Sequence, residues 1–344
     1  MKRPCNTKIH RQMLKMKSQK GFGLVELMIS LVLGMLLIGG VLSIFLSNQQ
    51  TFRSNEGLSR LQENARISFE LMAREVRQAG GNPCGAKLVG NVVNNASTTW
   101  SLNWEAGTVI GFAGTHTVTA VTTGTATANR ATATDAIQVL SGNLGDSASL
   151  ASNSTTTAQI TLTTSTHSIT ATDIVMVCDG SSAAIAQVSS VSGTALYHVS
   201  ATGTPGNCSQ GLGYPSNCAT AVGTSKTFQP GGFVSDYSAS TWYVGFNSRG
   251  GRSLFRIDIN GTEEIAEGVT DMDIAYLLRT EATGALDSNW VDASSITDWT
   301  PTAAKQVVAV RMKLTLETLA KVGTNQQKLE RQLIHVVSLR NRSL

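Results

Sequence analysis

The chain has 344 residues, 41% of them hydrophobic, and its formal net charge is +4 at pH 7. This length and apolar content provide for one large folded domain or two small ones. Seven Lys and Arg residues, with no Asp or Glu, precede residue 21, and without them 20 basic side chains stand against 23 acidic ones. The positive charge therefore belongs to the N-terminus, and we expect no nucleic-acid partner for the remaining chain.

An apolar segment covers residues 22–46, and Glu26 is its only charged residue. About 20 apolar residues cross a bilayer, whereas the apolar core of a secretory signal peptide is shorter, so we predict a transmembrane half-helix. Basic flanks stay in the cytoplasm, which places the chain after the helix on the outer side of the membrane. A carboxylate in hydrocarbon is costly without a partner, so Glu26 is a candidate functional residue. The alternative is an ordinary signal anchor with a stray acid.

Residues 47–80 are more polar but keep a helical period, which predicts an amphipathic second half of the same helix. Arg66 and Glu70 are four residues apart, where opposite charges stabilise a helix by a few tenths of a kcal/mol. Gly80 allows the left-handed conformation that ends many helices, and Pro83 prevents continuation. The apolar stripe of this half consists of Leu58, Leu61, Ala65, Phe69, Met72, Val76 and Ala79.

Residues 81–344 are predicted to form one β-rich domain. From about residue 92 to 225 the composition is dominated by Thr, Ala, Ser, Gly and Val, which favours short strands over disorder. Asn260-Gly261 is a two-residue hairpin signal after a strand that begins at Ser253. Further strands are expected over residues 172–178, 242–246, 272–278, 308–316 and about 329–340. The predicted fold class is α+β, with a long N-terminal helix packed on a C-terminal antiparallel β domain.

Four cysteines, Cys84, Cys178, Cys208 and Cys218, lie in the segment that is expected to face an oxidising compartment, whereas Cys5 lies in the basic N-terminus. Four cysteines allow three connectivities. Nearness in the sequence favours Cys208 with Cys218, which leaves Cys84 with Cys178. Free thiols or a metal site are the alternative, although the chain has no C-x-x-C pair and no Cys/His cluster at zinc spacing. We therefore predict no metal and no cofactor.

The pattern Lys20-Gly21-Phe22, with Leu24 and Glu26 following at the head of an apolar helix, resembles the cleavage site of type IV prepilins and pseudopilins. The resemblance implies that residues 1–21 are a leader, which a prepilin peptidase removes between Gly21 and Phe22. It also implies methylation of the new N-terminal Phe22. Glu26 would then pair with the amine of a neighbouring subunit and set the register between subunits.

Short segments of the last third resemble the PilW-like minor pilins, one branch of this family. The resemblance implies a subunit that primes type IV pilus assembly and sits at or near the fibre tip. Its implied partners are other minor pilins, the major pilin, a large tip protein and the inner-membrane assembly platform. Its implied location is the inner membrane before assembly and the fibre at the cell surface afterwards. The matching segments are Ser253-Leu-Phe-Arg256, Glu267-Gly268-Val269 with Tyr276, Val310-Arg311, Leu339-Arg340-Asn341-Arg342, and Arg77-Gln-Ala-Gly80 with Cys84.

Two alternatives remain at this point. The J-type pseudopilins of type II secretion systems share the strand at Val269 and Tyr276, and Trp290 and Trp299 are compatible with that family. A membrane-anchored periplasmic enzyme is the other alternative. The five histidines are scattered, and the sequence has no H-E-x-x-H, G-x-S-x-G or phosphate-binding G-x-x-x-x-G-K pattern, so we predict no catalytic residues.

Overall fold

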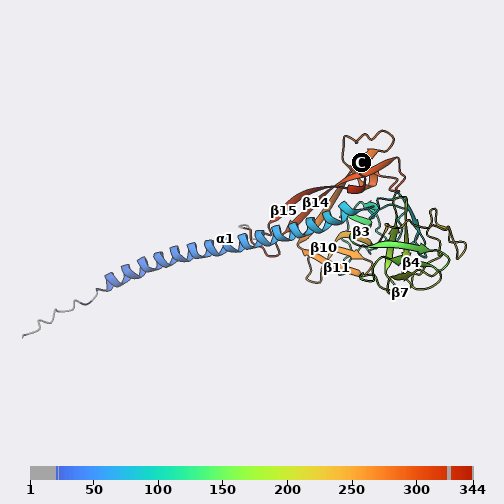
Figure 1. Cartoon of the computed structure of the whole chain (residues 1–344). Helices are drawn as coiled ribbons and strands as arrows, with labels where there is room; N and C mark the ends of the chain where they lie inside the picture. The colour runs from blue at the N-terminus through green and yellow to red at the C-terminus, as the bar shows by residue number, and fades with distance from the viewer. Residues whose placement is uncertain (1–20, 22, 324–326, 343–344) are drawn as a thin grey trace, which may run out of the picture. The chain divides into compact units, whose positions relative to one another are not determined.

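The computed structural model describes residue 21 and residues 23–323 and 327–342. Its main helix, α1 (Leu24–Gln78), closely matches the predicted one, although Phe22 lies outside the described residues (Figure 1). The chain divides into two compact units, of which one ends at Ser54 and the other begins at Asn55. The second unit contains the last part of α1 together with all of the described strands.

The described strands form two β-sheets, of eleven and four strands. The larger sheet consists of β1 (Leu88–Asn91), β2 (Val109–Phe112), β3 (Ala136–Ser154), β4 (Gln159–Leu162), β5 (Ile174–Cys178), β6 (Ser182–Gln187), β7 (Ser190–Ser192), β8 (Ala195–Tyr197), β9 (Phe233–Phe246), β10 (Arg252–Asp258) and β11 (Gly261–Glu267). The smaller sheet consists of β12 (Val269–Thr280), β13 (Val291–Asp292), β14 (Lys305–Glu317) and β15 (Glu330–Ser338). Two 3-10 helices, η1 (Ala293–Ser295) and η2 (Arg340–Arg342), complete the described elements.

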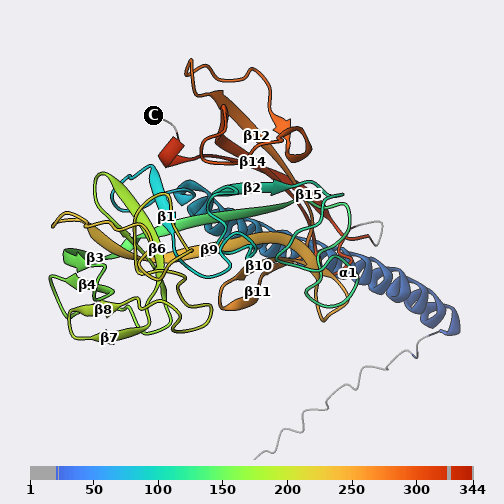
Figure 2. The same cartoon turned by 90° about the vertical axis from the view of Figure 1, so that its right-hand side faces the viewer.

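The main path of the larger sheet runs β1-β6-β5-β9-β3-β4-β8-β7, with β10 joining β9 to β11 and with β2 on β3 (Figure 2). The smaller sheet runs β13-β12-β14-β15. Neighbouring strands are antiparallel, as predicted, except β1 and β6, which are parallel. The Thr-rich region forms the predicted short strands, apart from β3, which has 19 residues. The α+β class is therefore confirmed.

The predicted apolar stripe of α1 packs into a core that both sheets share. Met72 and Val76 are fully buried there with Trp242 of β9 and Met272 of β12. Phe69 is only half-buried, and its ring lies 5.5 Å from the ring of His335 on β15. The residues of α1 that are buried are Leu61, Ala65, Ser68, Met72, Ala73 and Val76.

A carboxylate on the same face of α1 joins the helix to the larger sheet. Glu75 Oε2 accepts hydrogen bonds from Trp242 Nε1, at 2.6 Å, and from the Ser240 hydroxyl. Glu75 Oε1 accepts one from Arg256 Nε at 2.8 Å, and Arg256 also pairs with Asp258 at 2.7 Å. The Glu75 and Arg256 side chains are only 21% and 22% exposed, so solvent weakens this ion pair less than a surface pair. We call Glu75, Ser240, Trp242 and Arg256 the helix clamp.

The helix ends where the sequence predicts. Gly80 has a φ of +71°, which favours glycine, and its N–H donates to the Leu140 carbonyl at 2.8 Å. The Gly142 N–H in turn donates to the Gly81 carbonyl at 2.7 Å. These two bonds fix the helix exit to β3.

The hairpin at Asn260 differs from the prediction by one residue. Asp258 pairs with Gly261, so the two loop residues are Ile259 and Asn260, and the expected Asn260-Gly261 loop is wrong. The Asp258 carboxylate explains the shift, because Oδ1 accepts the Asn260 N–H at 2.7 Å and fixes the turn one residue earlier. Gly261, with a φ of +135°, then begins β11.

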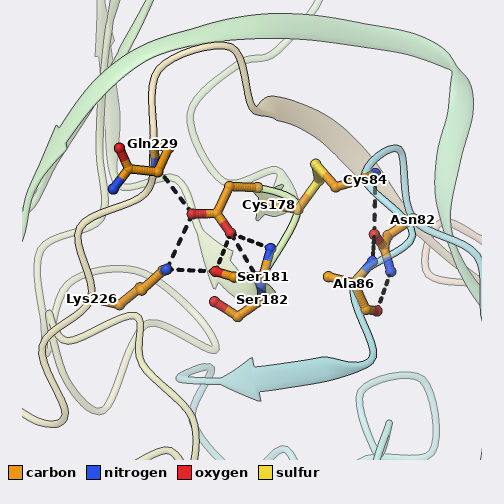
Figure 3. The surroundings of a disulfide bond; sticks show 9 residues. Asn82, Cys84, Ala86, Cys178, Ser181, Ser182, Lys226 and Gln229 are labelled. Atoms are coloured by element: carbon orange, nitrogen blue, oxygen red, sulfur yellow. Dashed lines mark hydrogen bonds and ion pairs between the residues drawn. A yellow bond between two sulfur atoms is a disulfide. The ribbon is translucent and has the colours of Figure 1, made fainter.

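Two disulfides link distant and close parts of the domain. Cys84 is joined to Cys178, which lies 94 positions further along the chain, and their Cα atoms are 5.9 Å apart. This disulfide ties the helix exit to β5 (Figure 3). Cys208 is joined to Cys218, ten residues away. These are the two pairs that nearness in the sequence favours.

We expect the two disulfides to differ in their contribution to stability. In the chain-entropy account a larger closed loop restricts the unfolded chain more, so the double variant Cys84→Ser, Cys178→Ser should lose about 5 kcal/mol of unfolding free energy. The matched variant Cys208→Ser, Cys218→Ser should lose about 3 kcal/mol. Urea denaturation of the full chain in one detergent measures both losses. An equal or larger loss for the second variant would contradict the expectation.

Removal of the helix clamp carboxylate should also destabilise the domain. Glu75→Ala leaves Arg256 and the Trp242 indole N–H without their acceptor, and we expect a loss of about 3 kcal/mol. The control is Glu70→Ala on the same helix, because Glu70 is 73% exposed and its pair with Arg66 spans 3.9 Å. Its loss should stay below about 0.5 kcal/mol. Equal urea midpoints for the two variants would show that Glu75 does not anchor the helix.

Candidate functional site

The first half of α1 is an apolar surface without a partner inside the chain. No residue between positions 24 and 46 is buried, and even large side chains such as Leu24 (78% exposed) and Phe45 (61%) are open. This stretch is long and apolar enough to cross a membrane. At about 1.5 Å per residue it spans roughly 35 Å, compared with about 30 Å for a bilayer core.

Glu26 lies in the first turn of this apolar half. Its Oε2 accepts the backbone N–H of Gly23 at 3.4 Å, and the Leu27 N–H donates to the Gly23 carbonyl at 3.1 Å. Glu26 thus occupies the position from which a glutamate reaches back to cap a helix start. A bond of 3.4 Å is long for an N–H donor, and the side chain is exposed. The carboxylate therefore has room for a stronger cationic partner.

Small residues leave space along the same half. A Cβ atom at Gly34, Gly39 or Gly40 would meet no other residue within 4 Å. Packing inside the chain therefore does not require glycine at these positions. Small residues let membrane helices approach one another closely, so their use here fits contact with another helix. The Ser30 hydroxyl donates a hydrogen bond to the Leu27 carbonyl at 3.0 Å, so this polar group is satisfied within the helix.

The remaining predicted residues of this segment are placed only in part. Gly21 is exposed, and a Cβ atom added to it would meet nothing within 4 Å. Phe22 and the leader residues 1–20 lie outside the described residues. Cleavage after Gly21 and methylation of Phe22 accordingly stay predictions.

A polar cluster beside the Cys84–Cys178 disulfide bears on the alternative of an enzyme (Figure 3). Lys226 Nζ donates to the Ser181 hydroxyl at 2.8 Å, a contact that a serine nucleophile and a lysine base also make. However, Lys226 is ion-paired with Asp179 at 3.1 Å, and the Ser181 hydroxyl donates to the same carboxylate at 2.6 Å. A paired ammonium group is a poor base, so this arrangement is that of a structural turn.

The Asp179 carboxylate holds that turn. Burial raises its pKa, but hydrogen bonds from Ser181, Gln229 and Ser182 outweigh burial and hold the pKa well below the usual range. The charged carboxylate is therefore the form that the fold stabilises. Among the described residues, no group of three His, Cys, Asp or Glu side chains is placed to hold a metal ion.

The segments that resemble minor pilins form the interface between the two sheets. Tyr276 of β12 is fully buried against Trp299, with ring centroids 5.0 Å apart. Gly111 of β2 makes room for it, because a Cβ there would lie 2.2 Å from the Tyr276 hydroxyl.

Sequence analysis missed Glu75, although a charged residue three positions after Met72, on the apolar face, is a signal for a buried polar contact.

Two family models match the chain. A model of the prokaryotic N-terminal methylation motif matches residues 16–42, which include Gly21, Phe22 and Glu26. A model of type IV pilus-assembly protein W matches residues 241–338, from the end of β9 to β15. No curated protein and no solved structure matches the chain. The two matched segments, one at the exposed apolar helix and one at the sheets that hold its other half, support a type IV pilus minor pilin of the PilW-like family.

Proposed function

We propose that this chain primes type IV pilus assembly and stays at or near the fibre tip, where it docks through its N-terminal helix. The observation that carries the proposal is one carboxylate in an exposed apolar helix, because Glu26 is the only charged residue between positions 21 and 52. In lipid or in a helical bundle such a group is costly unless a cation meets it. The amine that peptidase cleavage would free on Phe22 of a neighbouring subunit supplies that cation.

The pairing acts mainly through register. A uniformly apolar helix slides along its neighbours at little cost, whereas a single polar group fixes one alignment, as a lone buried polar residue does in a coiled coil. The Glu26 carboxylate meets an amine in the correct alignment and stays unpaired in the others. Cleavage after Gly21 comes first, because the amine does not exist before it.

The second half of α1 couples docking to the β domain. The helix clamp, the hydrogen bonds at Gly80 and Gly142, and the Cys84–Cys178 disulfide hold the helix on the sheets. Docking of the helix therefore brings the attached β domain into the assembly. The partners in this proposal are the prepilin peptidase, the assembly platform, the major pilin, other minor pilins and a large tip protein. The protein would be periplasmic behind its membrane helix before assembly.

The alternative of a J-type pseudopilin uses the same docking in a type II secretion system. The match of residues 241–338 to a pilus-assembly protein favours the pilus. The Trp290 and Trp299 side chains, which left the alternative open, have ordinary structural contacts, with Arg311 over the Trp290 ring at 5.2 Å and with Tyr276 against Trp299.

Maturation should depend on a small residue at position 21. We expect Gly21→Leu to block cleavage, because a branched side chain keeps the backbone out of a protease cleft. Gly34→Leu is the control, since it places the same side chain at a glycine within α1, away from the cleavage site and without a contact inside the chain. Gel mobility shows whether the leader is retained, and mass spectrometry of the native N-terminus should find methylated Phe22. A wild-type N-terminus in the Gly21→Leu variant would reject the assignment of the cleavage site.

Incorporation should depend on Glu26. We expect Glu26→Ala to be cleaved like wild type but to enter sheared pili at least about fivefold less, the equivalent of roughly 1 kcal/mol. Glu63→Ala, an exposed glutamate in the second half of α1, is the control and should enter normally. Immunoblots of pili against total membranes measure the ratio. Wild-type incorporation of Glu26→Ala would end the register hypothesis.

A further inference from the structure

Strand β9 has a gap in the row of strands along one of its edges. β3 pairs with one edge over most of its length. On the other edge β5 pairs as far as Asp236, and β10 begins at Ser240. Among the described strands, residues 237–239 therefore have no partner on this edge. β5 and β10 accordingly lie along different parts of β9, and β6 lies on the far side of β5 (Figure 2).

A cleft of about 690 Å³ lies at this gap. The start of β5 and the tip of the β10–β11 hairpin bound it, and the loop at Trp100 forms a further wall. Three residues of an extended strand measure about 10 Å, which is too short to pair with a typical strand of five or six residues. The volume, in contrast, lies within the usual range of about 300 to 1,000 Å³ for small-ligand sites.

The walls of the cleft are held in place before any ligand arrives. Gln187 is 2% exposed, and its Nε2 donates to the carbonyls of Thr172 at 2.9 Å and of Thr204 at 3.0 Å. Its Oε1 accepts the Gly206 N–H at 2.7 Å. All polar atoms of this amide are thus used to join two loops, so Gln187 supports the site and does not contact the ligand.

The lining is polar and acidic. The carboxylates of Asp173, Asp236 and Asp258 face no Lys, Arg or His among the described lining residues, which disfavours an anionic ligand. These carboxylates are already engaged, because Asp258 pairs with Arg256 at 2.7 Å, one oxygen of Asp173 accepts from Thr170, and Asp236 also has an interaction within the chain. The remaining attraction for a cation is correspondingly reduced.

The other groups suit a ligand with many hydroxyls. Trp100 contributes a half-buried indole, against which the C–H face of a sugar ring can pack. Asn260 is exposed at the hairpin tip, and its amide offers both a donor and an acceptor. Carboxylate oxygens accept from O–H groups. We propose that this cleft binds a neutral saccharide of one or two rings, a function that does not depend on helix docking.

The test uses the full chain in a phosphocholine detergent, because the head groups of maltoside detergents are themselves sugars. Galactose, glucose, N-acetylglucosamine, lactose and cellobiose are titrated by calorimetry and saturation-transfer NMR. We expect at least one of them to bind saturably with a Kd below about 10 mM. Sialyllactose, which is anionic, and trilysine, which is cationic, should bind at least about tenfold more weakly. Tighter binding of trilysine than of every neutral sugar would overturn the proposal, as would the absence of saturable sugar binding.

Variants locate the binding. Trp100→Ala should weaken it by about tenfold, whereas Trp290→Ala, which removes another half-buried indole on the smaller sheet, should leave it unchanged. Asn260→Ala alters only an exposed loop side chain and should weaken binding by about threefold, so it keeps the test valid if Trp100→Ala does not fold. Wild-type affinity in a folded Trp100→Ala variant, or in Asn260→Ala where Trp100→Ala does not fold, would place the sugar elsewhere and reject the cleft.

Discussion

Two glutamates on one helix differ in how many hydrogen-bond partners the chain gives them, and the attachment of the helix to its domain depends on the better supported one. Glu75, in the second half of α1, accepts hydrogen bonds from Ser240, Trp242 and Arg256. Glu26, in the first half, has a single backbone N–H at 3.4 Å. A carboxylate in an apolar environment needs partners, so Glu75 is satisfied within the chain, whereas Glu26 has little support from its own chain. The same helix thus carries one carboxylate that its own domain satisfies and one that the proposed docking would satisfy.

The helix exit shows how the chain makes the second half of α1 rigid. Gly80 and Gly81 exchange hydrogen bonds with β3, and three residues later Cys84 forms the disulfide to β5. A Cβ atom at Gly81 would lie 2.4 Å from the Asn341 side chain, so the C-terminal segment also closes on this point. Segments from both ends of the second unit therefore converge within a few residues.

Local patterns predicted what local physics determines. The apolar period of α1 and the glycines at its end predicted a helix over about residues 22–79, and α1 covers Leu24–Gln78. The strands of the last third followed from their alternation. The hairpin loop was wrong by one residue because a side chain, Asp258, selected the turn. The pattern of residue types alone does not predict that hydrogen bond.

Long-range pairing is what the sequence did not reveal. Glu75 pairs with Arg256, which is 181 positions away. The sequence shows a charged residue on the apolar face of the helix, but only the fold shows which residue it pairs with. The parallel pair of β1 and β6 and the gap along β9 likewise depend on which strands become neighbours. The site residues predicted at positions 21, 22 and 26 come from a contiguous motif, and no such motif marks the cleft.

The gap along β9 has a physical origin in the way the cores are divided. β9 has 14 residues and contributes to four hydrophobic clusters. Its second half packs with β10, because Trp242 shares a cluster with Leu254 and Tyr243 shares one with Phe255. Its first half packs with β5, because Val234 shares a cluster with Val175 and Tyr237 shares one with Met176. The uncovered residues lie at that junction. The lining of the cleft contains no residue of the helix clamp and none of the buried stripe of α1, and one of its carboxylates, Asp258, is paired with Arg256 of the clamp.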